Sequence, residues 1–253
     1  MSRALITGAT EGIGRALALA LAAEGHTVTA VARTQHRLDA LLAELDGVRA
    51  AGHGRLAADL GTPEGLEAVA AELRTGRYDL LVNNAATAPA GPFAGSGDPL
   101  GAAGAAAAVR LNCEAVVTLA HAFLPAARPG AALVNVSSAL AHTPKPGQAL
   151  YGATKAFVTA FSDALWYEQR GRGVHVLALC PGPTATRPGL HSDAPSALVR
   201  TPEQVAAATL AALRERRRTV VPGRAAALAA RAVRLLPRRT ALALLAEHPP
   251  TPL

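Results

Sequence analysis

The chain has 253 residues, of which 50% are hydrophobic and 17% are charged; this composition excludes a disordered protein and permits a large buried core. Its two cysteines, Cys113 and Cys180, are too few for a disulfide framework or a multi-cysteine zinc site, and they suit a reducing, cytoplasmic location. The net charge of +7 lies entirely in residues 214–253, which contain nine arginines and two glutamates, so the rest of the chain is neutral.

Apolar runs of strand length alternate along the chain with Ala- and Leu-rich runs of helical periodicity. We expect strands at residues 4–7, 27–32, 55–59, 79–83, 132–137, 174–180 and 219–221, and helices at 13–24, 35–46, 63–75, 102–124, 151–170 and 202–217. Strands that are apolar on both faces and are each followed by a helix indicate a parallel sheet covered on both sides. Right-handed crossovers then give a doubly wound α/β sheet of about seven strands, in a single domain over residues 1–223.

Residues 224–253 are expected to form a basic helical tail and not a separate domain, with two short amphipathic helices broken at Pro237. The tail could pack on the body or on a second subunit, lie on an anionic membrane surface, or bind nucleic acid. We favour packing, because the tail lacks both the Trp and Phe anchors of an interfacial helix and the aromatic side chains of a base-stacking surface. The start of the chain does not resemble a signal peptide, and no stretch approaches the roughly 18 uncharged apolar residues of a membrane span.

The first expected strand ends in the segment TGATEGIG, which carries Gly8, Gly12 and Gly14. Gly8 permits a tight turn, Gly12 lets the backbone approach a pyrophosphate, and Gly14 lets the following helix pack closely on the strand. The first N–H groups of that helix then point toward the phosphates of a dinucleotide. An ordinary glycine-rich turn is the alternative, but the order of strand, turn and helix favours a dinucleotide-binding loop.

Tyr151 and Lys155 are four residues apart in an expected helix and therefore lie on one face of it. We expect the lysine ammonium to lower the pKa of Tyr151 below its usual value of about 10. Such a phenol can donate a proton to a carbonyl oxygen, or accept one from an alcohol, near neutral pH. Ser138, just after the fifth strand, can hydrogen-bond the same substrate oxygen. Ser137 is the alternative serine, and alternation along a strand would point the two hydroxyls in opposite directions.

The end of the second strand indicates the type of dinucleotide. In NAD-binding folds an acidic residue about 20 positions after the glycines accepts hydrogen bonds from the ribose 2′-hydroxyl. Here the strand ends at Arg33, and Arg37 follows one helical turn later, so two cations are available to a 2′-phosphate. We therefore expect NADP(H), although Arg33 as a solvated charge at a strand end is the alternative.

These segments resemble the short-chain dehydrogenase/reductase family, whose glycine motif is TGxxxGxG. The resemblance covers residues 3–223 and implies a Rossmann fold and a reductase or alcohol dehydrogenase. The catalytic residues that it implies are Asn112, Ser138, Tyr151 and Lys155. Asn112 would kink its helix and hold a water that reaches Lys155. Glu11 departs from the pattern, because many NADP-dependent members have a basic residue before Gly12.

The resemblance also implies contacts with the cofactor. Asp59 and Leu60 would lie at the adenine, the segment 83–86 matches the family's NNAG segment with Ala86 in place of glycine, and Pro181, Gly182 and Thr184 would lie near the nicotinamide. With Arg33 and Arg37, the expected cofactor-binding residues are Gly8, Thr10, Glu11, Gly12, Ile13, Gly14, Arg33, Arg37, Asp59, Leu60, Asn84, Ala85, Ala86, Tyr151, Lys155, Pro181, Gly182 and Thr184. No metal site is expected.

Together these residues predict an NADP-dependent oxidoreductase that acts on a small carbonyl or alcohol substrate, with the tyrosine as general acid and base. The family resemblance implies a homotetramer or homodimer, formed through the helices at 102–124 and 151–170. Residues 183–201 match the family's mobile substrate loop. A non-catalytic dinucleotide-sensing or scaffold protein on the same fold is the alternative function. The substrate itself is not identified by the sequence.

Overall fold

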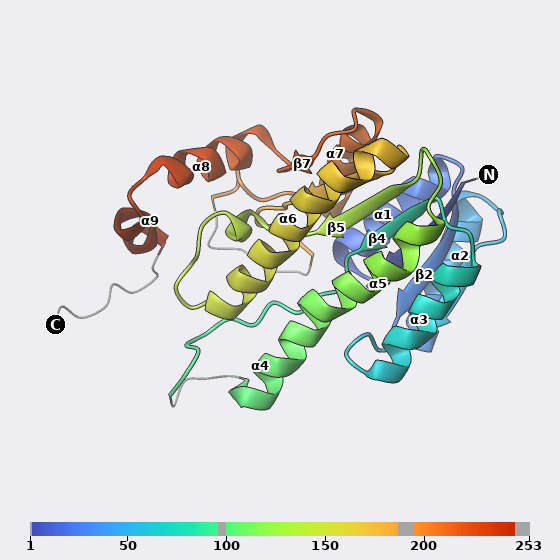
Figure 1. Ribbon diagram of the computed structural model, residues 1–253, viewed down its shortest axis with the longest axis horizontal. Coiled ribbons are helices and arrows are strands. Elements are labelled where there is room, and N and C mark those ends of the chain that lie inside the picture. The colour runs from blue at the N-terminus through green and yellow to red at the C-terminus, as the bar shows by residue number, and fades with distance from the viewer. Residues whose placement is uncertain (1, 96–99, 187–194, 246–253) are drawn as a thin grey trace.

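The computed structural model describes residues 2–95, 100–186 and 195–245. A parallel sheet with the strand order β3-β2-β1-β4-β5-β6-β7 runs through its centre (Figure 1). The strands are β1 (Arg3–Thr7), β2 (Thr27–Ala32), β3 (Gly54–Ala57), β4 (Leu80–Asn83), β5 (Ala132–Val136), β6 (His175–Leu179) and β7 (Thr219–Val220). The predicted doubly wound sheet of seven strands, a Rossmann-type α/β fold, is confirmed.

Helices cover both faces of the sheet. They are α1 (Gly12–Ala23), α2 (Gln35–Val48), α3 (Pro63–Thr75), α4 (Gly101–Val109), α5 (Ala115–Phe123), α6 (Ala149–Gln169), α7 (Pro202–Arg214), α8 (Arg224–Leu235) and α9 (Arg238–Leu245). The core side chains place α1, α2 and α7 on one face and α3, α5 and α6 on the other (Figure 1). The strand order reverses between β1 and β4, and a ligand of such a sheet binds where the carboxyl ends of those strands diverge.

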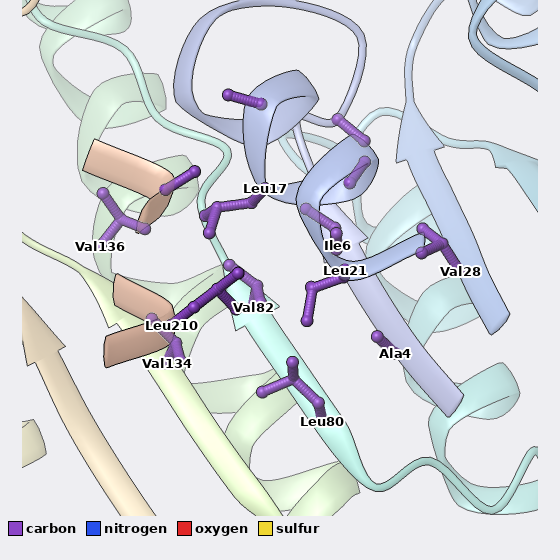
Figure 2. Close-up of a cluster of buried hydrophobic side chains, with 14 of the residues drawn as sticks. Ala4, Ile6, Leu17, Leu21, Val28, Leu80, Val82, Val134, Val136 and Leu210 are labelled. Carbon is purple, nitrogen blue, oxygen red and sulfur yellow. The ribbon is translucent and has the colours of Figure 1, made fainter. Parts of the chain in front are cut away.

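Each face of the sheet has its own apolar core because side chains alternate along every strand. On β1, Ala4 and Ile6 point to the α1 face, where Leu17 and Leu21 pack against them (Figure 2). Leu5, between them in sequence, belongs to the opposite core. Both faces of the central strands are therefore buried, as their continuous apolar runs predict.

Local signals in the sequence set where two of the helices begin. Thr62 accepts a hydrogen bond from the Gly65 N–H at 3.1 Å, and Pro63 follows it at the first position of α3. Thr201 and Gln204 form a reciprocal capping box at the start of α7. These caps fix the starts of one helix on each face of the sheet.

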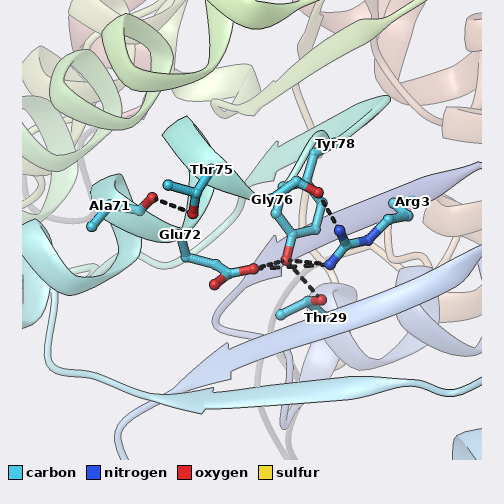
Figure 3. A network of polar contacts seen from close by, with 7 residues as sticks. All are labelled: Arg3, Thr29, Ala71, Glu72, Thr75, Gly76 and Tyr78. Atoms are coloured by element: carbon cyan, nitrogen blue, oxygen red, sulfur yellow. Dashed lines mark hydrogen bonds and ion pairs between the residues drawn. The ribbon is translucent and has the colours of Figure 1, made fainter.

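A polar cluster ties the amino ends of the strands together. The Tyr78 hydroxyl lies 2.9 Å from Thr29 Oγ1 and 2.6 Å from Glu72 Oε1, and the Arg3 guanidinium lies 4.6 Å from the centre of the Tyr78 ring (Figure 3). Arg3 also donates a hydrogen bond to the Gly76 carbonyl. Burial and the hydrogen bond to Glu72 raise the pKa of Tyr78 to about 12. This cluster therefore links the start of β1 and the segment before β4 to β2 at the end of the sheet opposite the glycine turn.

The expected helix at 102–124 is continuous along its axis but changes type in the middle. Between α4 and α5, residues Arg110–Glu114 form a π-helical turn, and the run from Gly101 to Ala126 is long and apolar enough to cross a membrane. Half of its most apolar window is buried inside the protein. Leu119 and Phe123 belong to the core on one face of the sheet, so α5 is a core helix, whereas only Ala108 of α4 is buried.

The tail contains two helices, α8 and α9, separated at Pro237 as predicted, at the end of the molecule opposite the N-terminus (Figure 1). Ala226 and Ala241 are buried, whereas Leu228 is 64% exposed and Leu235 is 87% exposed. Packing on the body therefore accounts for these two alanines but not for Leu228 and Leu235. Residues 246–253 of the expected tail and 187–194 of the expected substrate loop lie outside the described residues.

Candidate active site

Four loops that follow β1, β4, β5 and β6 meet at the carboxyl edge of the sheet. The glycine segment follows β1, and its neighbour is the Asn84–Ala85 segment after β4. The Thr7 hydroxyl accepts hydrogen bonds from the N–H groups of Asn84 at 2.9 Å and Ala85 at 3.0 Å. The Asn84 side chain in turn donates to the Thr7 carbonyl at 2.8 Å and to the Gly8 carbonyl at 3.1 Å. The turn after β1 is thus fixed by contacts to the central strand.

The glycines in this turn are required by space as well as by conformation. Gly8 and Gly12 have φ angles of 63° and 53°, in the left-handed region that favours glycine. A Cβ on Gly14 would lie 2.3 Å from the Gly8 carbonyl oxygen and 2.6 Å from Asn84 Nδ2. The cradle at the start of α1 therefore has the close backbone packing that a pyrophosphate-binding loop needs.

Tyr151, Lys155 and Ser138 come together between β5 and α6. Lys155 is 3% exposed; its Nζ donates a hydrogen bond to the Val136 carbonyl at 2.7 Å and lies 5.8 Å from the centre of the Tyr151 ring. Ser138 is hydrogen-bonded to Tyr151, and it also accepts a hydrogen bond from the Leu140 N–H at 3.2 Å. The structure brings these three predicted residues to one place.

The expected direction of the tyrosine pKa is wrong for this arrangement. Burial raises the pKa of Tyr151, and the hydrogen bond with Ser138 only partly opposes that rise. Lys155 is engaged with the Val136 carbonyl, and burial lowers its own pKa to about 8. Because the ammonium lies under the ring and is itself destabilised by burial, it does not act on the phenol as the spacing alone suggests.

Asn112 lies in the π-helical turn, so the helix changes type at this residue and then runs on into α5. Its Oδ1 accepts a hydrogen bond from the Thr87 N–H at 2.9 Å. Its Nδ2 donates to the Thr87 carbonyl at 2.8 Å and to the Thr154 hydroxyl at 3.1 Å. The amide therefore joins the segment after β4 to the helix turn that carries Tyr151. A water near Lys155 would have to bind the widened backbone, since both N–H groups of this amide are already used.

The two arginines expected at the 2′-phosphate differ in their surroundings. Arg37 lies 3.7 Å from the Glu11 carboxylate, which neutralises part of its charge. Arg33 is exposed at the end of β2 and forms no ion pair or side-chain hydrogen bond within the described residues. Arg33 is therefore the cation that a phosphate can reach without first breaking a pair. The sequence shows both Glu11 and Arg37 but not that their side chains meet.

The remaining expected cofactor residues lie along the same edge. Asp59 is exposed, and its Oδ1 accepts the Gly61 N–H at 2.9 Å, which leaves the other carboxylate oxygen accessible. Thr184 is buried, and its hydroxyl donates to the Gly182 carbonyl at 3.0 Å. Of the other predicted residues, Leu60 and Pro181 are buried, Thr10, Ile13 and Ala85 are half-buried, and Ala86 is exposed.

Sequence reasoning did not single out Thr7, Thr87 or Thr186 at the site. Thr7 was visible as the residue before Gly8. Thr186 contacts the glycine loop, because a Cβ on Gly12 would lie 2.8 Å from its Cγ2 atom. These contacts join segments 25 to 174 residues apart in the sequence, so no local pattern could have indicated them.

Comparison with known proteins agrees with this geometry. A sequence profile of the short chain dehydrogenases matches residues 2–193. The chain belongs to the short-chain dehydrogenase family. Within the family, a sulfoacetaldehyde reductase of Chromohalobacter salexigens is 38% identical over 182 residues, which are 70% of each protein. A short chain dehydrogenase of Pseudocercospora fijiensis is 32% identical over 76% of this chain and 62% of its own length, less than two thirds of that relative.

A solved short-chain dehydrogenase shares the whole architecture. The enzyme from Sphingobium yanoikuyae, in complex with NADPH, matches with a TM-score of 0.82 and 34% identity over 92% of each chain. The solved structures that resemble this chain therefore include a family member with NADPH bound.

Proposed function

We propose that the protein is an NADP(H)-dependent oxidoreductase that transfers hydride between the cofactor and a carbonyl or alcohol carbon. The observation that carries the proposal is the convergence of Ser138, Tyr151 and a buried Lys155 at the carboxyl edge of a sheet whose first turn has the close glycine packing of a pyrophosphate-binding loop. The glycine loop, Arg33 and Lys155 would hold the cofactor. When bound there, NADPH supplies the hydride that reduces a carbonyl carbon.

Tyr151 and Ser138 handle the oxygen of the substrate. Ser138 donates a hydrogen bond to the carbonyl oxygen as negative charge develops on it. Tyr151 donates the proton that converts this oxygen to a hydroxyl. Since burial keeps the pKa of Tyr151 above its usual value, the phenol is protonated at neutral pH. This state suits reduction, in which the tyrosine acts as an acid.

Lys155 and Asn112 support this chemistry from beneath. The Lys155 ammonium, held by the Val136 carbonyl, is a cation beside the site of proton transfer. Asn112 holds the Tyr151 turn through Thr154, whose hydroxyl donates to the Tyr151 carbonyl at 2.9 Å. We assign Asn112 a structural part in the site and propose that a water on the π-helical backbone completes the proton path.

The function is tested with a panel of substrates. Ketones, aldehydes, quinones, acyl-thioester ketones and alcohols are each assayed at 340 nm with NADPH, NADH and their oxidised forms. We expect turnover with at least one carbonyl class and a higher kcat/KM with NADPH. Tight NADPH binding without turnover on any class would favour the dinucleotide-sensing alternative. The name of the Chromohalobacter relative makes small aldehydes a sensible first class.

We propose that two or four copies of the chain associate through α4, α5 and α6. Phe157 on α6 is 43% exposed and stacks on Phe161 with ring centres 6.0 Å apart. Val109, at the end of α4, is 42% exposed. Exposed apolar groups on adjoining helices are typical of an interface between copies.

The association predicts the mass in solution. We expect a dimer or tetramer by light scattering at micromolar concentration, and a lower mass for Phe157→Glu, because a charge would be buried without a partner. The matched variant Val48→Glu, on the exposed side of α2, should keep the mass of the unmodified protein. A monomeric unmodified protein at that concentration would contradict the proposal.

A further inference from the structure

Three consecutive residues at the end of β5 reach the helix turn that carries Tyr151 and Lys155. The Val136 carbonyl accepts the hydrogen bond from Lys155 Nζ at 2.7 Å. The Ser137 hydroxyl lies 2.7 Å from the Lys155 carbonyl oxygen. Ser138 is hydrogen-bonded to Tyr151. The strand end therefore contacts Lys155 at both its backbone and its ammonium. Of these three residues, only Ser137 has no role in the proposed mechanism.

The direction of the hydrogen bonds around Ser137 follows from counting donors. A hydroxyl has one proton, and the Lys155 carbonyl can only accept, so the Ser137 proton points to that carbonyl. Thr159 Oγ1, 2.7 Å from Ser137 Oγ, must then donate to it. The Cys180 thiol, 3.9 Å from Thr159 Oγ1, donates to Thr159 in turn. The result is an ordered chain from Cys180 through Thr159 and Ser137 to the backbone of Lys155.

This chain is enclosed by the protein. Ser137 is 2% exposed, Thr159 is 7% exposed and Cys180 is fully buried. Inside a protein, hydrogen bonds are stronger than in water and a fully satisfied network favours one arrangement. The hydrogen bond from Ser137 to the Lys155 carbonyl therefore holds the end of β5 against α6, and Ser137 directly precedes Ser138.

We propose that Ser137 is a positioning residue, whose hydroxyl sets the turn carrying Tyr151 and Lys155 at its distance from Ser138. This role rests on the proposed function of those three residues. Ser137 touches neither the phenol of Tyr151 nor the ammonium of Lys155 and acts through the helix backbone. A displacement of about 1 Å of a catalytic group can lower the rate by about a hundredfold. Loss of the Ser137 hydrogen bond should therefore lower the turnover rate as well as the stability of the fold.

Ser137→Ala separates these two effects because it should fold. Thr159 is four residues after Lys155 in α6, and a threonine hydroxyl can donate to the carbonyl of residue i−4. Without Ser137, Thr159 can turn its proton to the Lys155 carbonyl, so no buried polar group is left without a partner. What is lost is the hydroxyl contact with the Lys155 backbone, while the hydrogen bond from Lys155 Nζ to the Val136 carbonyl remains. Ser137→Cys keeps the side-chain size and replaces the hydroxyl by a weak donor.

The chain provides a matched control in Ser162. Ser162 is 1% exposed and also joins β5 to α6: it accepts a hydrogen bond from Asn135 Nδ2 at 2.9 Å and donates to the Val158 carbonyl at 2.6 Å. It lies seven residues beyond Lys155 along α6, away from the reacting groups. Ser162→Ala should lower the melting temperature at least as much as Ser137→Ala, because Asn135 loses an acceptor.

The pKa of Lys155 shows whether the helix turn has moved, and it can be measured without a substrate. The chain has only two lysines, Lys145 and Lys155, so labelling lysine with ¹³C at Cε gives two signals that can be titrated by NMR. The titratable groups that face Lys155 are Tyr151 on α6, Cys113 on the π-helical turn and Cys180 after β6. In Ser137→Ala, a looser turn admits water, and we expect the pKa of Lys155 to rise by at least about half a unit from its value of about 8.

The expected results are therefore specific to Ser137. Ser137→Ala should lower kcat about ten- to a hundredfold with the KM for NADPH within about threefold, and should move the pKa of Lys155, with Ser137→Cys in between. Ser162→Ala should change kcat by no more than about twofold and the pKa of Lys155 by no more than about 0.2 units. A Lys155 titration identical in Ser137→Ala and the unmodified protein would overturn the proposal, whether or not a substrate has been found. An unmodified protein without turnover would instead count against the proposed function.

Discussion

Tyr151→Phe should lose nearly all turnover and keep its binding of NADPH. The substitution removes only the hydroxyl, so the ring and its contact with Lys155 remain. A positioned acid typically contributes about 10² to 10⁴ in rate, and we expect kcat to fall by at least about a hundredfold. NADPH binding, measured by fluorescence titration, should stay within about threefold. Turnover within threefold of the unmodified protein would contradict the mechanism.

The same hydroxyl sets the pH dependence of the two directions. Because burial raises the pKa of Tyr151, the acid form that reduction needs is present at neutral pH and is lost only as the pH rises through that pKa. Alcohol oxidation needs the phenolate, so its rate should increase with pH over the range in which the reduction rate declines. Tyr151→Phe should remove both trends from whatever activity remains.

Arg33→Ala should change the choice of cofactor with little effect on the chemistry. Arg33 is exposed and forms no ion pair within the described part of the chain, so it can bind a 2′-phosphate with charge-assisted hydrogen bonds. Such bonds contribute about 1.5–3 kcal/mol, which corresponds to a rise of about 10- to 150-fold in the KM for NADPH. The KM for NADH should change little, because NADH has no phosphate at that position.

Arg55→Ala is the matched control for Arg33. Arg55 is an exposed arginine on the neighbouring strand β3, but its guanidinium lies 2.5 Å from Asp39 Oδ1. Its loss should leave the KM for both cofactors unchanged within about twofold, since a surface ion pair contributes little. If the unmodified protein already prefers NADH, Arg33 does not select the cofactor, and Glu11 was the better guide in the sequence.

The sheet and its glycine loop could be predicted because they depend on patterns that are local in the sequence. Continuous apolar runs such as 132–137 identify buried parallel strands. The glycines after β1 are needed because a Cβ would collide with other atoms of the same turn and its neighbours. The strand β3 ends at Ala57, two residues before the predicted limit, and the Asp59 carbonyl then accepts the Thr62 N–H in the turn that leads to α3.

The electrostatics of the site could not be predicted in the same way. The spacing correctly predicted that Tyr151 and Lys155 lie close together. The direction in which the pKa of Tyr151 shifts depends on how deeply both groups are buried, and the spacing does not show that. Pairing of Arg37 with Glu11 depends on the reach of two long side chains from different elements. Ser137 was considered only as a rival to Ser138, and its contact with the Lys155 carbonyl appears only once β5 lies against α6.

A labelled hydride tests most directly whether this site transfers hydride from NADPH to a carbonyl carbon. NADPH in which both hydrogens at C4 of the nicotinamide are deuterium is mixed with the best carbonyl substrate of the panel, and the alcohol product is examined by mass spectrometry and NMR. Hydride transfer from NADPH with Tyr151 as the acid predicts one deuterium on the carbinol carbon of the product, transferred at a rate that falls at least about a hundredfold in Tyr151→Phe. Product without deuterium at that carbon, or label transfer at the same rate in Tyr151→Phe, would contradict hydride transfer at this site.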